Sequence, residues 1–339
     1  MRLAPTLAIA LLLVAAEGHA AEPIASSFVP TRFEFHSAFL MNLHHFLFDA
    51  ARHPGRIDKV QWTQPPTADE MARMRAAVQF YAMAYGQRDL LFDDELRDIK
   101  HALAHADDAR QQAAGLGLPP ALAATLDSTA PIYARCLWAG QDQVNRRWIA
   151  QVQSLEARYG TQIQPRLERI FDARFPAVVR DDVVVTTGTF TGAYTDAPPP
   201  QTVLPSGWDE YGGLASLEMI WHEAAHVEPG DRLEALIEQA SHAMGREVPD
   251  GLWHAALFEA VGTQVAQVIA ADGHGDYVAY ADKNGVYRRG WAKYVPLLHA
   301  EWKTWLDGQG SLQQAVDAMV AKQPRVAGST ASAPGASVR

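Results

Sequence analysis

Residues 221–230 read WHEAAHVEPG, and the interpretation of the whole chain depends on this stretch. His222 and His226 stand four positions apart, so a helix would place both imidazoles on one face, about one turn apart. Imidazoles at this spacing can share one zinc ion. Glu223 would point roughly 100° away from His222, where its carboxylate can take a proton from water without binding the metal. The stretch therefore predicts a helix that carries a catalytic zinc site.

The residues around this pattern are apolar, unlike those of a solvated surface helix. They are Leu217, Met219, Ile220, Trp221, Ala224, Ala225 and Val227. Two histidines and a glutamate in such surroundings need partners that offset the cost of removing them from water. A metal ion is the simplest such partner. The alternative is a buried polar helix that is satisfied by hydrogen bonds.

A catalytic zinc site has three protein ligands and one open position, so a third ligand is needed. The segment 250–269, DGLWHAALFEAVGTQVAQVI, predicts a helix that contains two candidates, His254 and Glu259. On a helical projection His254 lies at the centre of the large apolar stripe, and Glu259 lies roughly 140° away among small residues. If the apolar stripe faces the HEAAH helix, His254 is the ligand. If the small-residue face packs there, Glu259 is the ligand; we favour His254.

The remaining pattern predicts an α+β fold that is predominantly α-helical. Apolar residues recur at helical spacing from about residue 32 to 175, and Thr67 with Glu70 forms a capping box. A small β patch is expected at about 183–204, where β-branched residues dominate. Helices are expected again near 214–227, 231–245, 251–271, 291–306 and 311–321.

The N-terminal stretch 33–52, FEFHSAFLMNLHHFLFDAAR, is read as one amphipathic helix. His36 would lie in the middle of its apolar stripe, His44 at the edge and His45 on the opposite face. Because His44 and His45 diverge by roughly 100°, the three are not expected to bind one ion. His36 is interpreted as a core histidine.

A β segment, a helix with HEAAH and a later helix with a third ligand together resemble the zincin metallopeptidases, in particular the gluzincin type, over about 183–271. The resemblance implies a zincin-like helical domain, Zn²⁺ as cofactor and Glu223 as general base. It also implies a glutamate as third ligand, and Glu259 is the only one in the segment, although it lies farther from His226 than is usual. The chain is also similar to uncharacterised secreted bacterial proteins with WHEAAH, LWHAALF and NGVYRRGW segments.

Two residues depart from the zincin pattern. Glu228 stands where zincins usually have an apolar residue, and Pro229 is expected to end the helix early. Pro229 also occupies the position of the glycine in the metzincin extension, so that variant of the family is excluded.

Two further side chains are candidates for supporting roles. Tyr287, in the NGVYRRGW segment, is a candidate to stabilise the oxyanion of a tetrahedral intermediate, or else it packs structurally. Glu218 precedes His222 by four residues and could accept a hydrogen bond from an imidazole Nδ1, or else it is an ordinary helix glutamate.

Residues 1–20 have the pattern of a cleaved signal peptide, so the protein is expected to be periplasmic or secreted. The only cysteine, Cys136, cannot form an intramolecular disulfide. The net charge of -10 argues against nucleic acid as a partner, and no later apolar run is long enough to span a membrane. We expect an N-terminal helical region at 21–180, a zincin-like metal-binding region at 181–322 and a disordered tail at 323–339.

Taken together, the sequence predicts an exported zinc-dependent hydrolase that acts on a peptide or small-molecule substrate. A metallopeptidase that uses Glu223 as general base toward water activated by zinc is the favoured reading. The alternatives are a non-catalytic periplasmic protein with a structural or vestigial metal site, and a zinc hydrolase of a non-peptide substrate.

Overall fold

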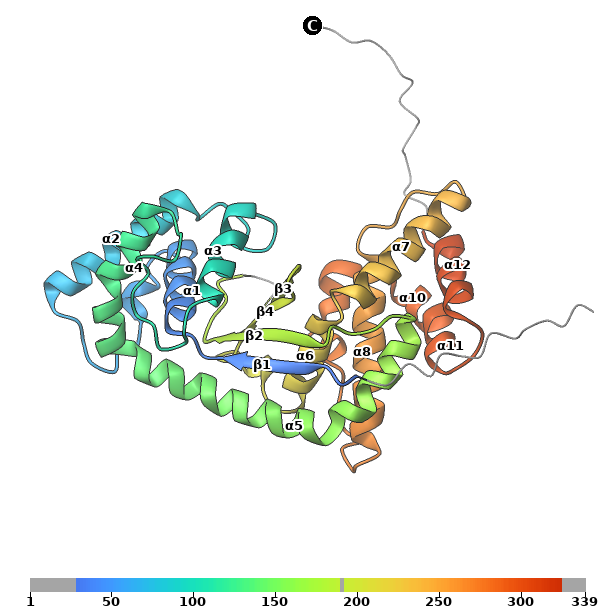
Figure 1. The fold of residues 1–339 in the computed structure, drawn as a ribbon. Coiled ribbons are helices and arrows are strands. Elements are labelled where there is room, and N and C mark those ends of the chain that lie inside the picture. The colour runs from blue at the N-terminus through green and yellow to red at the C-terminus, as the bar shows by residue number, and fades with distance from the viewer. Residues whose placement is uncertain (1–28, 190–191, 325–339) are drawn as a thin grey trace, which may run out of the picture.

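The computed structural model describes residues 29–189 and 192–324. The fold is α+β and mostly helical, as predicted, with a small sheet between two groups of helices (Figure 1). The predicted signal peptide at 1–20 lies outside the described residues, as does the predicted tail at 323–339 except for its first two residues. Within the described part, no helix is long and apolar enough to cross a membrane.

Among the described residues, the sheet has four strands in the order β1-β2-β4-β3. Strands β1 (Arg32–His36), β2 (Val178–Val184) and β4 (Gln201–Pro205) are parallel to one another. The short strand β3 (Tyr194–Asp196) pairs antiparallel with β4 and forms one edge. The β patch expected at 183–204 thus exists, and it is joined by a strand from the beginning of the chain.

Strand β1 corrects one prediction, because the sequence pattern predicts a helix there. In RFEFH, aromatic and other residues alternate, and this period of two suits a strand. Phe33 packs edge-on against Trp221 of the HEAAH helix, with ring centroids 5.0 Å apart. His36 therefore lies at the end of a strand and not on a helical stripe, and its Nδ1 atom is 3.0 Å from the carboxylate of Asp108.

The N-terminal group of helices packs around α1 (Phe39–Arg52), whose residues from Phe39 to Ala50 are all buried. Helices α2, α3 and α4 contact α1, and the predicted capping box of Thr67 and Glu70 begins α2. The elements are η1 (Ile57–Lys59), α2 (Ala68–Ala84), α3 (Asp94–Ala104), α4 (Pro120–Tyr133), the π-helical turn η2 (Ala134–Trp138) and α5 (Ala139–Phe171).

The C-terminal group contains the HEAAH helix. Helix α6 ends at Ala224, and Pro229 lies in the first turn of the next helix, where a proline is well tolerated. Pro229 thus begins a helix in this structure and does not interrupt one. The elements are η3 (Asp209–Tyr211), α6 (Leu214–Ala224), α7 (Glu228–Ala243), α8 (Leu252–Ala270), α9 (Tyr280–Lys283), η4 (Tyr287–Trp291), α10 (Val295–Leu297), η5 (Leu298–Trp302), α11 (Lys303–Leu306) and α12 (Leu312–Lys322).

Two hydrophobic clusters make up the core. One joins α5, the sheet and the C-terminal helices, and the other joins α1 to α4 with Val184, Tyr194 and Val203 of the sheet. The long helix α5 runs from one group of helices to the other (Figure 1). The sheet contributes to both clusters, so it couples the N-terminal helices to the HEAAH helix. The predicted division of the chain at residue 180 stays a prediction.

Candidate metal centre

Three imidazoles meet between α6, the turn that follows it and α8. The Nε2 atom of His222 lies 3.1 Å from Nε2 of His226 and 3.3 Å from Nε2 of His254. One ligand atom of each ring lies within 4.8 Å of those of the other two. Among residues 29–189 and 192–324 this is the only such group of three or more histidine, cysteine or acidic side chains. The structure therefore brings His254 to the HEAAH pair and leaves Glu259 outside the group.

Helix packing explains this arrangement. His226 lies in the turn after α6, and its backbone N–H donates to the carbonyl of Glu223 at 3.1 Å, which keeps the two histidines close beyond the helix end. Helix α8 packs against α6, and its large apolar residues, such as Leu257 and Val261, are completely buried. The apolar stripe faces the core, and His254 is carried with it toward His222.

The three histidines are held in their neutral form. Burial lowers the pKa of His222 well below its ordinary value. Burial also lowers the pKa of His226 to about 4 and that of His254 to about 2. Neutral imidazole is the form that donates a lone pair to a metal, so the protonation state of the group suits a metal ion.

The contacts among the nitrogens also fit a cation. In either neutral tautomer His222 Nε2 has one lone pair or one proton, so one hydrogen bond can satisfy only one of its two close contacts. A cation at the meeting point would accept the lone pairs of all three rings together. Three neutral nitrogen ligands with an open fourth position are a ligand set of catalytic zinc sites, so these residues fit zinc.

Aromatic rings fix the orientation of the imidazoles. Phe258 stacks on His222 with ring centroids 3.7 Å apart and an angle of 23° between the planes. Trp253 stacks on His254 at 5.0 Å, and Trp291 approaches the same ring at 4.8 Å. These apolar walls reduce the access of water and lower the local dielectric, which strengthens electrostatic interactions at the group.

Glu223 follows His222 in the chain, is buried and is held by the edge strand. The hydroxyl of Thr195, in β3, donates to Glu223 Oε2 at 2.8 Å and approaches the backbone carbonyl of Glu223 at 3.1 Å. Burial raises the pKa of the Glu223 carboxyl to about 7, and the Thr195 hydrogen bond opposes this rise. Oε1 makes no hydrogen bond within the described residues, so one carboxylate oxygen is oriented and the other is left for water.

Glu259 and Tyr287 bind each other. The Tyr287 hydroxyl donates to Glu259 Oε2 at 3.0 Å, and burial together with this carboxylate raises the pKa of the tyrosine. No hydrogen bond or ring contact in the described part of the chain joins Tyr287 to the three histidines. Glu259 is not part of the histidine group, and its hydrogen bond with Tyr287 of η4 gives both side chains a partner. The oxyanion role of Tyr287 stays a prediction.

Glu218 is also engaged elsewhere. Its carboxylate accepts from the Tyr277 hydroxyl at 2.6 Å and from the backbone N–H of Tyr280 at 3.0 Å. The Nδ1 atom of His222 is buried and has no hydrogen-bond partner among the described residues. The suggestion that Glu218 orients an imidazole is therefore wrong, and stacking on Phe258 holds the His222 ring instead.

Sequence reasoning missed the residues of the sheet that reach Glu223. Thr195 contacts Glu223 directly, Thr202 is its register partner in β4, and Asp181 in β2 is the register partner of Thr202. A signal was present, because an aspartate inside a strand of β-branched residues is unusual unless it has a specific environment. The partner could not be identified from spacing, because Thr195 and Glu223 are 28 residues apart and meet only through the packing of β3 against α6.

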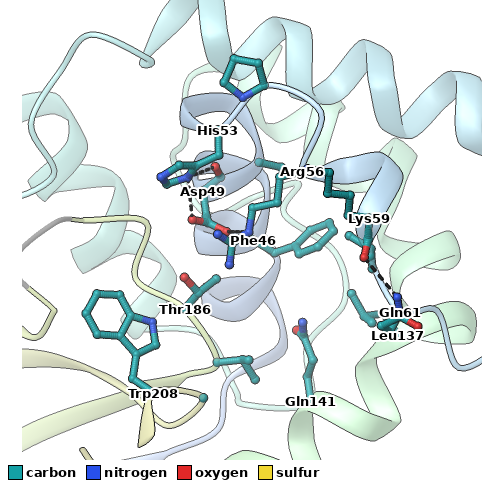
Figure 2. A pocket seen from close by; sticks show the side chains of 15 residues that line it. Phe46, Asp49, His53, Arg56, Lys59, Gln61, Leu137, Gln141, Thr186 and Trp208 are labelled. Carbon is teal, nitrogen blue, oxygen red and sulfur yellow. Dashed lines mark hydrogen bonds and ion pairs between the residues drawn. The ribbon is translucent and has the colours of Figure 1, made fainter. Parts of the chain in front are cut away.

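A separate cavity of about 620 Å³ lies where α1 meets the carboxyl ends of β2 and β4 (Figure 2). Asp49 accepts from Arg56 at 2.6 Å and from His53 at 3.1 Å, and the three side chains line one side of it. Thr186 and Trp208 line the other side. None of the three clustered histidines lines this cavity, so it is distinct from the candidate metal centre.

Comparisons with protein-family models, curated proteins and solved structures find no match. The resemblance to zincins therefore rests on the HEAAH segment and its surroundings in this chain. A function has to be argued from the geometry of the histidine group and of Glu223.

Proposed function

We propose that this protein is a zinc-dependent hydrolase, and specifically a metallopeptidase. His222, His226 and His254 would hold the ion, and Glu223 would act as general base. The observation that carries the proposal is the convergence of three neutral imidazoles, whose ligand atoms lie within 4.8 Å of one another, with the buried Glu223 directly after His222 in the chain. The N-terminal segment adds the proposal that the enzyme acts in the periplasm or outside the cell.

The chain's own residues would perform the proton transfers. A bound zinc ion would supply Lewis acidity, which activates water and polarises the scissile carbonyl. Glu223 would take the proton of the attacking water and deliver it to the nitrogen of the leaving amine. Thr195 holds Oε2 of this carboxylate, so that Oε1 can face the water. The rings of Phe258 and Trp291 would limit competing solvent around the imidazoles.

Metal content and hydrolysis together test the proposal. The purified protein should contain about one equivalent of zinc by mass spectrometry, and His222→Ala should lose it. Glu223→Gln should keep the zinc but lose cleavage of a quenched fluorescent peptide library by a factor on the order of 10³ or more. Glu228→Gln is the matched control, because Glu228 is close in the chain but exposed.

Each outcome separates the alternatives. A protein that is free of metal and unaffected by chelators would refute the zinc site. Zinc without peptide cleavage, but with hydrolysis of model esters, would favour a non-peptide substrate. Zinc that only raises the unfolding temperature, with no hydrolysis of either kind, would favour a structural metal. Full activity in Glu223→Gln would refute the assigned base.

A further inference from the structure

The cavity drawn in Figure 2 lies at the carboxyl ends of two neighbouring strands, and none of the three clustered histidines lines it. Strands β2 and β4 are parallel, so their carboxyl ends meet at one edge of the sheet. Thr186 comes shortly after β2 and Trp208 shortly after β4, and both line the cavity. In open sheets with parallel strands, ligands bind outside this edge, and a volume of about 620 Å³ suits a small molecule.

The two main side-chain acceptors beside this cavity already have partners. The Asp49 side chain is 4% exposed, and its two carboxylate oxygens pair with Arg56 at 2.6 Å and with His53 at 3.1 Å. The Oε1 atom of Gln141 accepts from the Tyr133 hydroxyl. The carboxylate and this amide oxygen are therefore engaged by the protein itself.

The groups that remain are mostly donors. The Lys59 ammonium and the indole N–H of Trp208 make no hydrogen bond or ion pair in the described part of the chain. The side-chain N–H groups of Gln141 also have no partner there, since only its oxygen is bonded. Arg56 uses Nε in its ion pair, and its two terminal nitrogens can donate further. Gln61 adds an acceptor only at the exposed rim, so the cavity favours a ligand that is rich in acceptors.

The charges around the cavity leave one positive charge in excess. Asp49 balances Arg56, and Asp58, which precedes Lys59, pairs instead with Arg75 at 2.8 Å. Lys59 thus contributes an unbalanced ammonium, in a chain whose net charge is -10. A ligand with one negative charge matches this excess better than a dianion does. A carboxylate has that charge and accepts several charge-assisted hydrogen bonds at once.

Apolar groups complete the walls of the cavity. Phe46 and Leu137 are buried, with only 7% of each exposed, and Trp208 stands on the other side. The ring of Tyr211 packs edge-on against the Trp208 ring, with centroids 6.1 Å apart, and so fixes this wall. Walls of this kind accept an aromatic or aliphatic group.

We propose that this cavity binds a small organic monocarboxylate that carries an apolar group. Arg56, Lys59 and Gln141 donate to the carboxylate, and the apolar group packs between Phe46 and Trp208. An amino acid fits less well, because its ammonium would meet a buried carboxylate that is already paired. This second site goes beyond the proposed hydrolysis, since no candidate metal ligand lines the cavity.

Isothermal titration calorimetry with matched probes tests the chemistry of the ligand. The probe 3-phenylpropionate carries one carboxylate and one ring, and it should bind at a single site per chain. The amide 3-phenylpropionamide lacks the charge, and L-phenylalanine adds an ammonium, so each should bind at least about tenfold more weakly. The proposal is overturned if 3-phenylpropionate does not bind, if either analogue binds equally well, or if phenyl phosphate binds more tightly.

Replacements at the cavity test the location of the site. Lys59→Glu reverses the excess charge and Trp208→Leu removes an apolar wall, so each should weaken binding of 3-phenylpropionate roughly tenfold. Lys59 is exposed, so its replacement should leave the fold intact even if Trp208→Leu does not. Lys283→Glu, at an exposed lysine of α9, is the matched control for charge and should change the affinity less than about threefold.

His222→Ala separates this site from the candidate metal centre. It should bind 3-phenylpropionate as well as the original protein does, because His222 does not line the cavity. Unaltered affinity in Lys59→Glu, or a loss in His222→Ala, would overturn the proposal. Binding is measured without hydrolysis, so a protein that proved free of zinc would refute the proposed function and leave this test intact.

Discussion

Replacing Lys100 with methionine is expected to destabilise the protein strongly, because the Asp196 carboxyl would remain buried without its cationic partner. Lys100 Nζ lies 2.5 Å from Asp196 Oδ2 and 2.6 Å from the carbonyl of Leu90. The lysine side chain is 0% exposed and the aspartate side chain 2%. The ammonium also lies 4.2 Å from the ring centre of Tyr194. Water cannot replace any of these partners without opening the core.

The magnitude follows from this burial. Removing one partner of a buried ion pair costs about 3–5 kcal/mol, a large part of the roughly 5–15 kcal/mol that stabilises a domain. Burial lowers the pKa of Lys100 even though Asp196 opposes the change, so attraction within the pair does not fully offset desolvation. The double replacement Lys100→Met with Asp196→Asn should therefore cost much less, about 1–2 kcal/mol.

Urea unfolding of the two single variants and the double variant measures this coupling as a double-mutant cycle. Lys59→Met is the control, because Lys59 is exposed. The reasoning is refuted if Lys100→Met costs less than about 1 kcal/mol, or if the double variant is as unstable as the single one.

The same variant connects stability with the site. Tyr194 and Asp196 face the N-terminal helices, where His45 and Lys100 hold them, and Thr195 between them faces Glu223. Successive side chains of a strand point to opposite faces, so the anchors and the Thr195 hydroxyl move together. Lys100→Met should lower hydrolysis at temperatures where the protein is still folded, with zinc content unchanged. Unaltered kcat would show that β3 needs no such anchor.

Four other replacements test separate side chains. His254→Ala should weaken zinc binding by about 100-fold or more and Glu259→Gln by less than about threefold, measured by competition with a chromophoric chelator; the reverse order would make Glu259 the ligand. Burial raises the pKa of Glu156 to about 7, so its ionisation begins to destabilise the folded state as pH rises above the ordinary value of 4.5, and the full cost is present above about pH 7. Glu156→Gln should thus add about 1–2 kcal/mol at pH 8, discounted for partial exposure, and nothing at pH 4; equal gains at both pH values would contradict this cause. Phe258→Ala should cost about 3–5 kcal/mol and reduce zinc affinity, because the His222 ring loses the surface on which it stacks; unchanged affinity would show that the ring needs no such support.

The helical part of the centre could be predicted from the sequence because its rules are local. The spacing of His222 and His226 already implies two imidazoles on one side of one turn. The apolar stripe of the helix at 252–270 implies that His254 faces the core, whereas Glu259 does not. Each of these inferences needs only the period of a helix and the preference of apolar residues for burial.

Strand β1 illustrates what local rules cannot supply. The five residues of β1 are followed closely by α1. The hydrophobic residues of the two segments, taken together, also match a helical period. The strand forms because β2 offers hydrogen bonds along its free edge and Trp221 offers a surface for Phe33. Both partners lie far along the chain, so the choice between strand and helix is made by tertiary contacts. The same reason explains why His36 was placed on the wrong element.

The residues behind Glu223 were beyond prediction for a related reason, and they change how the site is understood. A motif identifies groups that meet within one helix, but the environment of Glu223 comes from three strands that meet only in the sheet. Thr195 is fixed from one side by the N-terminal helices through Tyr194 and Asp196, and its hydroxyl lies 3.2 Å from that of Thr202 in β4. The N-terminal half of the chain therefore helps to position Glu223 through β3, although it contributes no candidate metal ligand. Replacements on either side of β3 should therefore lower kcat more than they weaken zinc binding. A loss of kcat at unchanged zinc affinity distinguishes the orientation of the base from the assembly of the metal site.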